Sequence, residues 1–386
     1  MLEGEMVPRM EVCPECGVPL MISAGQRWEE NGVISLTMSP TNRVVFYESA
    51  IIDNLFRGIE ELIGSGVWHI VTESRRRDVR KYIERSFPEE IEAMQTFDPV
   101  SGMKELVEMR RSYNQQVNEM GLVYGYGEIK FSTLWESGVD YPWRTQVIVN
   151  PWSMYLYPAE MMGSVEAFEQ TDMRVEYREI AEGIFEVTAS PGGHPLELKE
   201  RLRKKRYPFK PGEILYERCQ HCGVPAEICE CLWDLEHGTI YDPATRRRMA
   251  IFGPWAVDSV LDDLQEELGE KIQDAVVEAL RRHLRSSLSE ESWRKDMVIF
   301  NRMSALRGLG NLVQFEGDRD YLTVTFENSC MPLLMVGTVQ GLFEMAMGKE
   351  SSTREWELSD DGDLTVTVRG KKAMVAVESP ALEDIS

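Results

Sequence analysis

Apolar residues recur at helical spacing in two stretches that lie far apart along the chain. In residues 50–64 they stand at positions 51, 52, 55, 59, 62 and 63, and Gly64 follows where a helix commonly ends. Residues 257–269 have apolar side chains at 257, 260, 261, 264 and 268 and also close on a glycine. The spacing predicts one amphipathic helix in each stretch.

Other stretches alternate between apolar and polar residues, as half-buried strands do. Asn31-Gly32 predicts the turn of a hairpin in residues 28–36. Strands are predicted over residues 128–134, 145–149, 173–180, 183–189, 321–326, 353–358 and 363–368, and further helices over 101–119 and 159–171. Helices that precede an antiparallel meander place the chain in the α+β class.

The same blocks occur twice in the same order. Cys13 to Pro19 returns as Cys219 to Pro225, a shift of 219 − 13 = 206 positions. Later blocks, Asn118 with Asn301 and Gly163 with Gly337, keep the order with shorter shifts of 183 and 174. We therefore predict two tandem homologous domains, each with a cysteine knuckle, a helical layer and an antiparallel sheet. The predicted limits are residues 1–195, a basic linker at 196–215, and residues 216–386, with 206 − 183 = 23 extra residues inserted in the first copy.

Six of the seven cysteines lie in two clusters. Cys219, Cys222, Cys229 and Cys231 bring four thiolate donors into a dozen residues, which predicts a closed, structural zinc site. An iron–sulfur centre or a redox-active dithiol is the alternative. The first copy has only Cys13 and Cys16, because Ser23 and Gly25 stand at the other two positions. This pair is a decayed site, recruits a donor such as Glu15, or meets the same pair of a second chain.

The overall charge of −23 argues against binding to nucleic acid, since phosphate binding needs a basic surface. Two basic runs, residues 75–81 and 199–206, are interpreted as solvated surface. No apolar window is long enough for a bilayer span, and the acidic start lacks the features of a secretory signal. We expect a cytoplasmic protein that does not contact membranes, with a homodimer or a place in a larger complex left open.

Two groups of residues are candidates for a ligand site. The first group is a helical block that recurs in the second copy and comprises Glu73, Arg76, Arg77 and Arg80. Its spacing fits an exposed ladder of ion pairs or an arginine clamp that holds a carboxylate or phosphate. Aromatic and methionine residues gather near the first sheet. Trp152 and Tyr155 are its best candidates for an apolar or aromatic ligand, although most of this group is expected in the core.

The run from Arg43 to Ala50, followed by Leu55-Phe56 and residues 59–64, resembles the 4-vinyl-reductase-type domain family. The resemblance implies the fold of the haem-dependent nitric-oxide sensors and a ligand-sensing role, in several members with bound zinc. The metal-binding cysteines of that family lie late in the domain, whereas this chain keeps only Cys330 there. No DNA-binding helix-turn-helix segment accompanies the two copies.

Sequence signatures of common catalytic sites are absent, including the nucleophile elbow, the phosphate-binding loop and the His-Glu-x-x-His zinc motif. The Gly-x-Gly motifs at 125–127 and 308–310 are interpreted as tight turns. Two functions remain. One is a non-catalytic, zinc-containing binding or sensory protein. The other is an accessory subunit or an enzyme of an anaerobic or cofactor pathway that acts on an apolar carboxylic acid.

Overall fold

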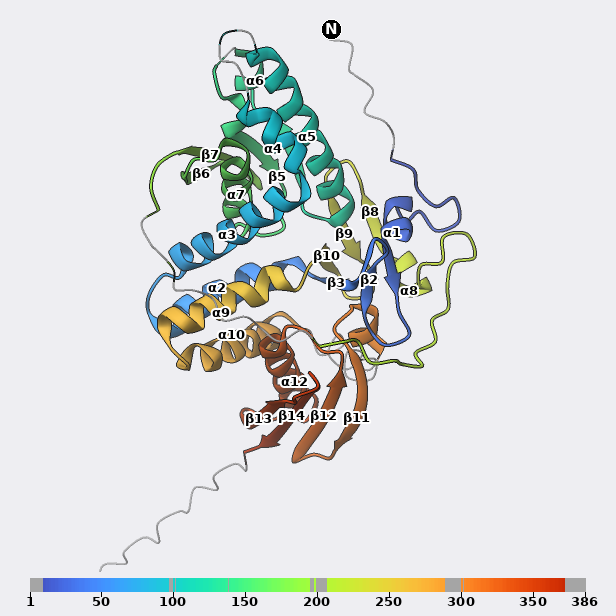
Figure 1. Cartoon of the computed structure of the whole chain (residues 1–386). Helices are drawn as coiled ribbons and strands as arrows, with labels where there is room; N and C mark the ends of the chain where they lie inside the picture. The colour runs from blue at the N-terminus through green and yellow to red at the C-terminus, as the bar shows by residue number, and fades with distance from the viewer. Residues whose placement is uncertain are drawn as a thin grey trace, which may run out of the picture.

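The computed structural model describes residues 10–96, 100, 102–137, 139–194, 198, 207–288, 300 and 302–371 (Figure 1). It confirms the α+β class, with antiparallel sheets and separate helical layers. Within these ranges, no helix combines the length and the apolar character that a membrane crossing requires.

One six-stranded sheet takes strands from both halves of the chain, in the order β1-β2-β3-β10-β9-β8. At its centre β3 pairs with β10, and Phe46 lies opposite Ile251. These two positions are 251 − 46 = 205 apart. The matching glutamates of the repeated Glu-Arg block, Glu73 and Glu278, have the same separation (278 − 73 = 205). The halves therefore meet about a local twofold axis. The strands are β1 (Gln26–Trp28), β2 (Ile34–Leu36), β3 (Ser39–Glu48), β8 (Leu232–Asp234), β9 (Thr239–Asp242) and β10 (Arg247–Phe252).

Two four-stranded antiparallel sheets lie on opposite sides of the helices (Figure 1). Their strand orders, β4-β5-β7-β6 and β11-β12-β14-β13, have the same topology. The predicted strands fall on these sheets, except that residues 132–134 leave β4 for a short helix. The strands are β4 (Glu128–Phe131), β5 (Thr145–Val149), β6 (Met173–Ala181), β7 (Ile184–Pro191), β11 (Asn311–Gly317), β12 (Tyr321–Glu327), β13 (Ser352–Leu358) and β14 (Leu364–Gly370).

The helices of the two halves interlock. Helix α2 packs on α10, and α9 packs on α3, so the first long helix of each half lies on the second long helix of the other. Helices α7 and α12 cover α3 and α10 in turn. The bounds are α2 (Ser49–Ile63), α3 (Trp68–Ser86), α7 (Tyr157–Glu169), α9 (Trp255–Leu268), α10 (Lys271–Ser287) and α12 (Pro332–Ala346). Shorter or peripheral helices are α1 (Leu20–Gly25), α4 (Pro88–Gln95), α5 (Met103–Tyr124), α6 (Leu134–Ser137), η1 (Pro142–Arg144) and α8 (Ala226–Cys229).

Each hairpin turn is seated on the Gly-x-Gly turn of the other half. The backbone N–H of Gly310 donates to the carbonyl of Gly32 at 3.1 Å, and that of Gly127 donates to Gly238 at 2.9 Å. A Cβ atom on Gly32 or Gly238 would stand 2.4 or 2.6 Å from the opposing backbone, and both residues have positive φ. Only glycine allows this approach.

The largest buried cluster mixes side chains of the two halves. Leu55 and Phe56 of α2 share it with Val260 of α9, Leu280 of α10 and Phe343 of α12. The halves are thus joined by a common core as well as by a common sheet. Residues 196–197 and 199–206 of the predicted linker lie outside the described residues, and the predicted domain limits stay a prediction.

Candidate metal centre

Two short knuckles of the same shape carry the first cysteine pair of each half. In one, the N–H of Cys13 donates to Val18 and the N–H of Gly17 donates back to Cys13, both at 2.8 Å. Cys219, Val224 and Gly223 repeat this arrangement at 2.9 Å. Both glycines have positive φ, 78° and 74°, which permits the tight turn after the second cysteine.

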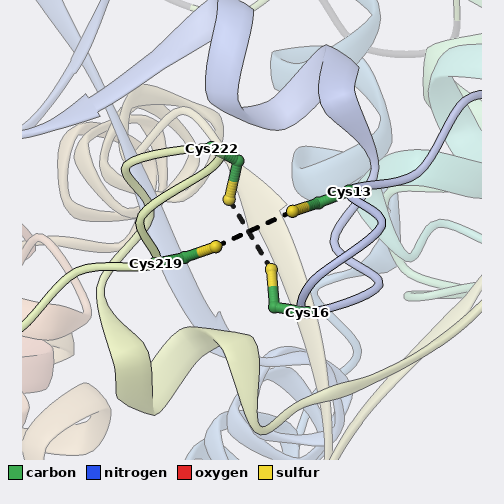
Figure 2. Close-up of side chains that lie close together, drawn as sticks. All are labelled: Cys13, Cys16, Cys219 and Cys222. Atoms are coloured by element: carbon green, nitrogen blue, oxygen red, sulfur yellow. Dashed lines mark hydrogen bonds between the residues drawn. The ribbon is translucent and has the colours of Figure 1, made fainter.

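The central pairing of β3 with β10 brings these knuckles together. Their four sulfur atoms point toward a common centre (Figure 2), and every sulfur lies within 4.8 Å of the other three. The Sγ atoms of Cys13 and Cys219 are 3.7 Å apart, and those of Cys16 and Cys222 are 3.6 Å apart. The cluster therefore has two donors from each half of the chain.

The spacing of the sulfur atoms fits a tetrahedral metal. A zinc ion holds thiolates at about 2.3 Å, so the edge of a regular Zn–S tetrahedron is about 3.8 Å. The two short distances, 3.7 and 3.6 Å, match this edge. Four soft donors fill all positions of such an ion. The residues present thus fit a closed four-thiolate site.

The surroundings also affect the protonation of the thiols. Burial raises the pKa of the Cys13 thiol, but hydrogen bonds from the backbone N–H groups of Cys16 and Glu15 outweigh burial and lower it to about 6. Burial raises the pKa of Cys16 and of Cys222 to about 12. Because a bound cation deprotonates the thiols that coordinate it, these two protons would leave when a metal binds.

The converging sulfur atoms differ from the four that the sequence spacing grouped. Cys229 lies beside the cluster, and its Sγ contacts the carbonyl of Val224 at 3.7 Å. Cys231 is 7% exposed and packs with Val224 and Ile228 in an apolar cluster. The Cys229 thiol is also within hydrogen-bond reach of Cys16 and Cys222 at the edge of the cluster, whereas Cys231 packs apart from it. The four mutually close donors therefore come from both halves. Cys13 and Cys16 thus lie beside the first cysteine pair of the second half in the same chain.

The candidate arginines Arg76 and Arg77 are engaged within the protein. Arg76 is 8% exposed and forms ion pairs with Glu73 and, at 2.7 Å, with Glu166. Arg77 binds both oxygens of Asp263 on α9, at 3.0 and 2.8 Å. These arginines link helices, and the predicted clamp for a ligand stays a prediction.

The candidate aromatic residues also face neighbouring side chains. Trp152 is 3% exposed, stacks on Tyr126 and packs at a tilt against Phe252, with ring centroids 5.1 and 5.0 Å away. The hydroxyl of Tyr155 donates to Glu60 at 2.7 Å. Both contacts suit the core interpretation that the sequence analysis gave for most of this group.

A second set of potential metal ligands comprises Glu166, Asp172 and His194. Arg76 lies 2.7 Å from Glu166, and Arg80 lies 3.2 Å from Asp172. Two guanidinium groups thus neutralise the carboxylates that a cation would need. We interpret this set as an ion-pair network in which His194 lies 2.9 Å from Glu166.

The sequence contained one signal for the shared cluster. The Cys-x-x-Cys-Gly-Val-Pro block is the most similar segment of the two halves, whereas Cys229 and Cys231 have no counterpart. Comparison with known proteins adds no further guide: no protein-family model matches the chain, and neither a curated protein nor a solved structure matches it.

Proposed function

We propose that this chain is a zinc-containing, non-catalytic small-molecule-binding protein in which one Zn²⁺ fastens the two halves together. The convergence of Cys13, Cys16, Cys219 and Cys222 at tetrahedral spacing carries the proposal. Four protein thiolates leave no open position for a substrate or a reactive water, which favours a structural ion.

The binding role is supported by the way the halves meet. A small, partly open cavity with apolar walls and a few charged groups lies where helices of the two halves meet, and ligand sites often combine such walls with a few charged groups. We also propose that the chain is related to the 4-vinyl-reductase-type domains, which resemble ligand sensors. This part of the proposal rests on the sequence alone.

Elemental analysis of the purified full chain tests the metal centre. We expect about one zinc per chain, and Cys16→Ser to abolish binding and lower the free energy of unfolding by about 4 kcal/mol or more, because the binding energy of the metal is also folding energy. Cys231→Ser is the matched control, since Cys231 packs in an apolar cluster with Val224 and Ile228 and is not one of the four mutually close cysteines. Zinc retained by Cys16→Ser and lost by Cys231→Ser would instead support the local four-cysteine site.

A further inference from the structure

A fifth thiol lies at the edge of the four-cysteine centre. Cys229 is the last residue of α8, and its thiol is within hydrogen-bond reach of the thiols of Cys16 and Cys222. It is not one of the four mutually close cysteines. Cys229 and Cys16 are both half-buried, so a small solute can reach them from solvent. Four thiolates fill the positions of a tetrahedral ion, so the centre has one more thiol nearby than such an ion needs.

The first half has a hydroxyl where the second has this thiol. The shift of 206 that relates the two knuckles places Ser23 opposite Cys229 (229 − 23 = 206). The hydroxyl of Ser23 donates to the carbonyl of Leu20 within its own helix α1 at 3.0 Å. Ser23 also lines an open cavity together with Cys222 of the other half. The knuckle can therefore be built with serine at this position, and what the thiol of Cys229 adds is its chemistry.

We propose that Cys229 makes the metal centre redox-sensitive, because a peroxide can join Cys229 to Cys16 in a disulfide and thereby remove one of the four zinc ligands. This inference rests on the proposed function and adds the regulation of the same site. A cysteine that coordinates zinc is a thiolate, the nucleophilic form of the side chain. An accessible thiolate with a second thiol beside it is the usual arrangement of a redox-sensing cysteine pair.

The reaction consumes one peroxide and two sulfur groups. The Cys16 thiolate attacks one oxygen of hydrogen peroxide, the O–O bond breaks, hydroxide leaves and Cys16 becomes a sulfenic acid. The sulfur of Cys229 then attacks Sγ of Cys16, the S–O bond breaks, and the departing hydroxide takes the proton of the Cys229 thiol to form water. The two sulfur atoms together supply the two electrons that reduce the peroxide. Three thiolates remain, which no longer close a four-thiolate site, and a dithiol reductant reverses the change.

Peroxide treatment of the full-length, zinc-loaded protein tests the proposal. Zinc release is followed with a chromogenic chelator, and disulfides are located by peptide mapping without reductant. We expect a peptide pair joined through Cys16 and Cys229, and we expect Cys229→Ser to lose zinc about tenfold more slowly than the wild type. Cys231→Ser should lose zinc as fast as the wild type, because Cys231 packs apart from the centre. Equal rates in the wild type and Cys229→Ser, or disulfides that leave Cys229 out, would overturn the proposal.

Moving the thiol to the other half sharpens the test. Because the two knuckles are related by the local twofold axis, Ser23→Cys combined with Cys229→Ser places a thiol beside Cys222 as Cys229 lies beside Cys16. We expect this double variant to recover rapid zinc release, with a disulfide between position 23 and Cys222; release as slow as in Cys229→Ser alone would overturn the proposal. Zinc content before peroxide keeps the two hypotheses apart. A wild type without zinc that still forms the disulfide through Cys229 would refute the metal centre, whereas one zinc per chain and no such disulfide would refute this inference alone.

Discussion

The two halves contain the same cluster of three charged side chains but complete it with different neighbours. In each, a glutamate and an arginine three residues apart on one helix meet a second glutamate on the helix that covers it. The covering glutamates are almost fully buried, at 0% and 1% exposure. The sets are Glu73, Arg76 and Glu166 on α3 and α7, and Glu278, Arg281 and Glu344 on α10 and α12.

The difference lies in what else reaches the covering glutamate. Glu344 receives a second guanidinium from Arg285 at 2.7 Å, and the hydroxyl of Ser352 donates to it at 2.7 Å. Glu166 accepts from the backbone N–H of Met173 at 2.8 Å and lies 2.9 Å from Nε2 of His194, while the guanidinium of Arg80 is 3.8 Å away. A buried carboxylate thus needs several donors, but the second half supplies two strong cations where the first relies mainly on one.

Removing the shared arginine should therefore damage the first half more than the second. Arg76→Ala leaves Glu166 with weaker partners and should cost about 3–5 kcal/mol, the range for breaking a buried ion pair. Arg281→Ala should cost less, because Arg285 still pairs with Glu344. Urea unfolding measures both, with Arg178→Ala as a surface control expected below about 1 kcal/mol. Equal losses would mean that Arg285 does not compensate.

The sequence comparison identified the Glu-Arg pair of each cluster but aligned the glutamate of the covering helix incorrectly. The repeated Glu-Arg block was visible because its residues are neighbours on a single helix. For the covering helix, the sequence comparison aligned Gly163 with Gly337, a shift of 174. This shift places Glu166 opposite Gln340 in the alignment of the two halves. The ion pairs require Glu344, a shift of 344 − 166 = 178, and Gly163 then matches Gly341. A slip of four residues keeps the same helix face inward, so apolar pattern alone does not fix the register.

The helices and strands were predictable because each depends on local periodicity. The helix expected at residues 50–64 is α2, which ends at Gly64 in the left-handed conformation. The metal centre was not predictable in the same way. Four neighbouring cysteines satisfied the local spacing rule, whereas the observed set depends on β3 and β10 pairing across about 200 positions. Long-range strand pairing is not encoded in a spacing motif.

The two halves also differ at a hydrogen bond between Tyr155 and Glu60, which the residues at the related positions of the second half cannot form. The hydroxyl of Tyr155 donates to Glu60 at 2.7 Å, and the separations of 178 and 205 place Leu333 and Gln265 at the related positions. Tyr155→Phe should therefore destabilise the protein by about 1.5–2 kcal/mol, as expected for a hydrogen bond to a charged group. Thermal and urea unfolding check the value. Leu333→Met is the control on the other side and should change stability by less than about 1.5 kcal/mol; a larger effect there would show that the two positions do not differ as described.

The smallest expected effect concerns Glu278, the partly exposed glutamate of the charged cluster in the second half. Hydrogen bonds from Arg281, with a further contribution from Arg282, lower the pKa of Glu278 to about 2. A carboxyl whose pKa is lower in the folded state contributes stability above its unfolded pKa, and this contribution disappears as pH falls toward the folded pKa. The wild type should therefore exceed Glu278→Gln in stability at pH 6, by less than about 1 kcal/mol because solvent screens this partly exposed group. The difference should shrink between pH 4.5 and pH 2. Urea unfolding of both proteins from pH 6 to pH 3 provides the test, and a difference that stays constant over that range would show that the ion pairs of Glu278 do not stabilise the fold.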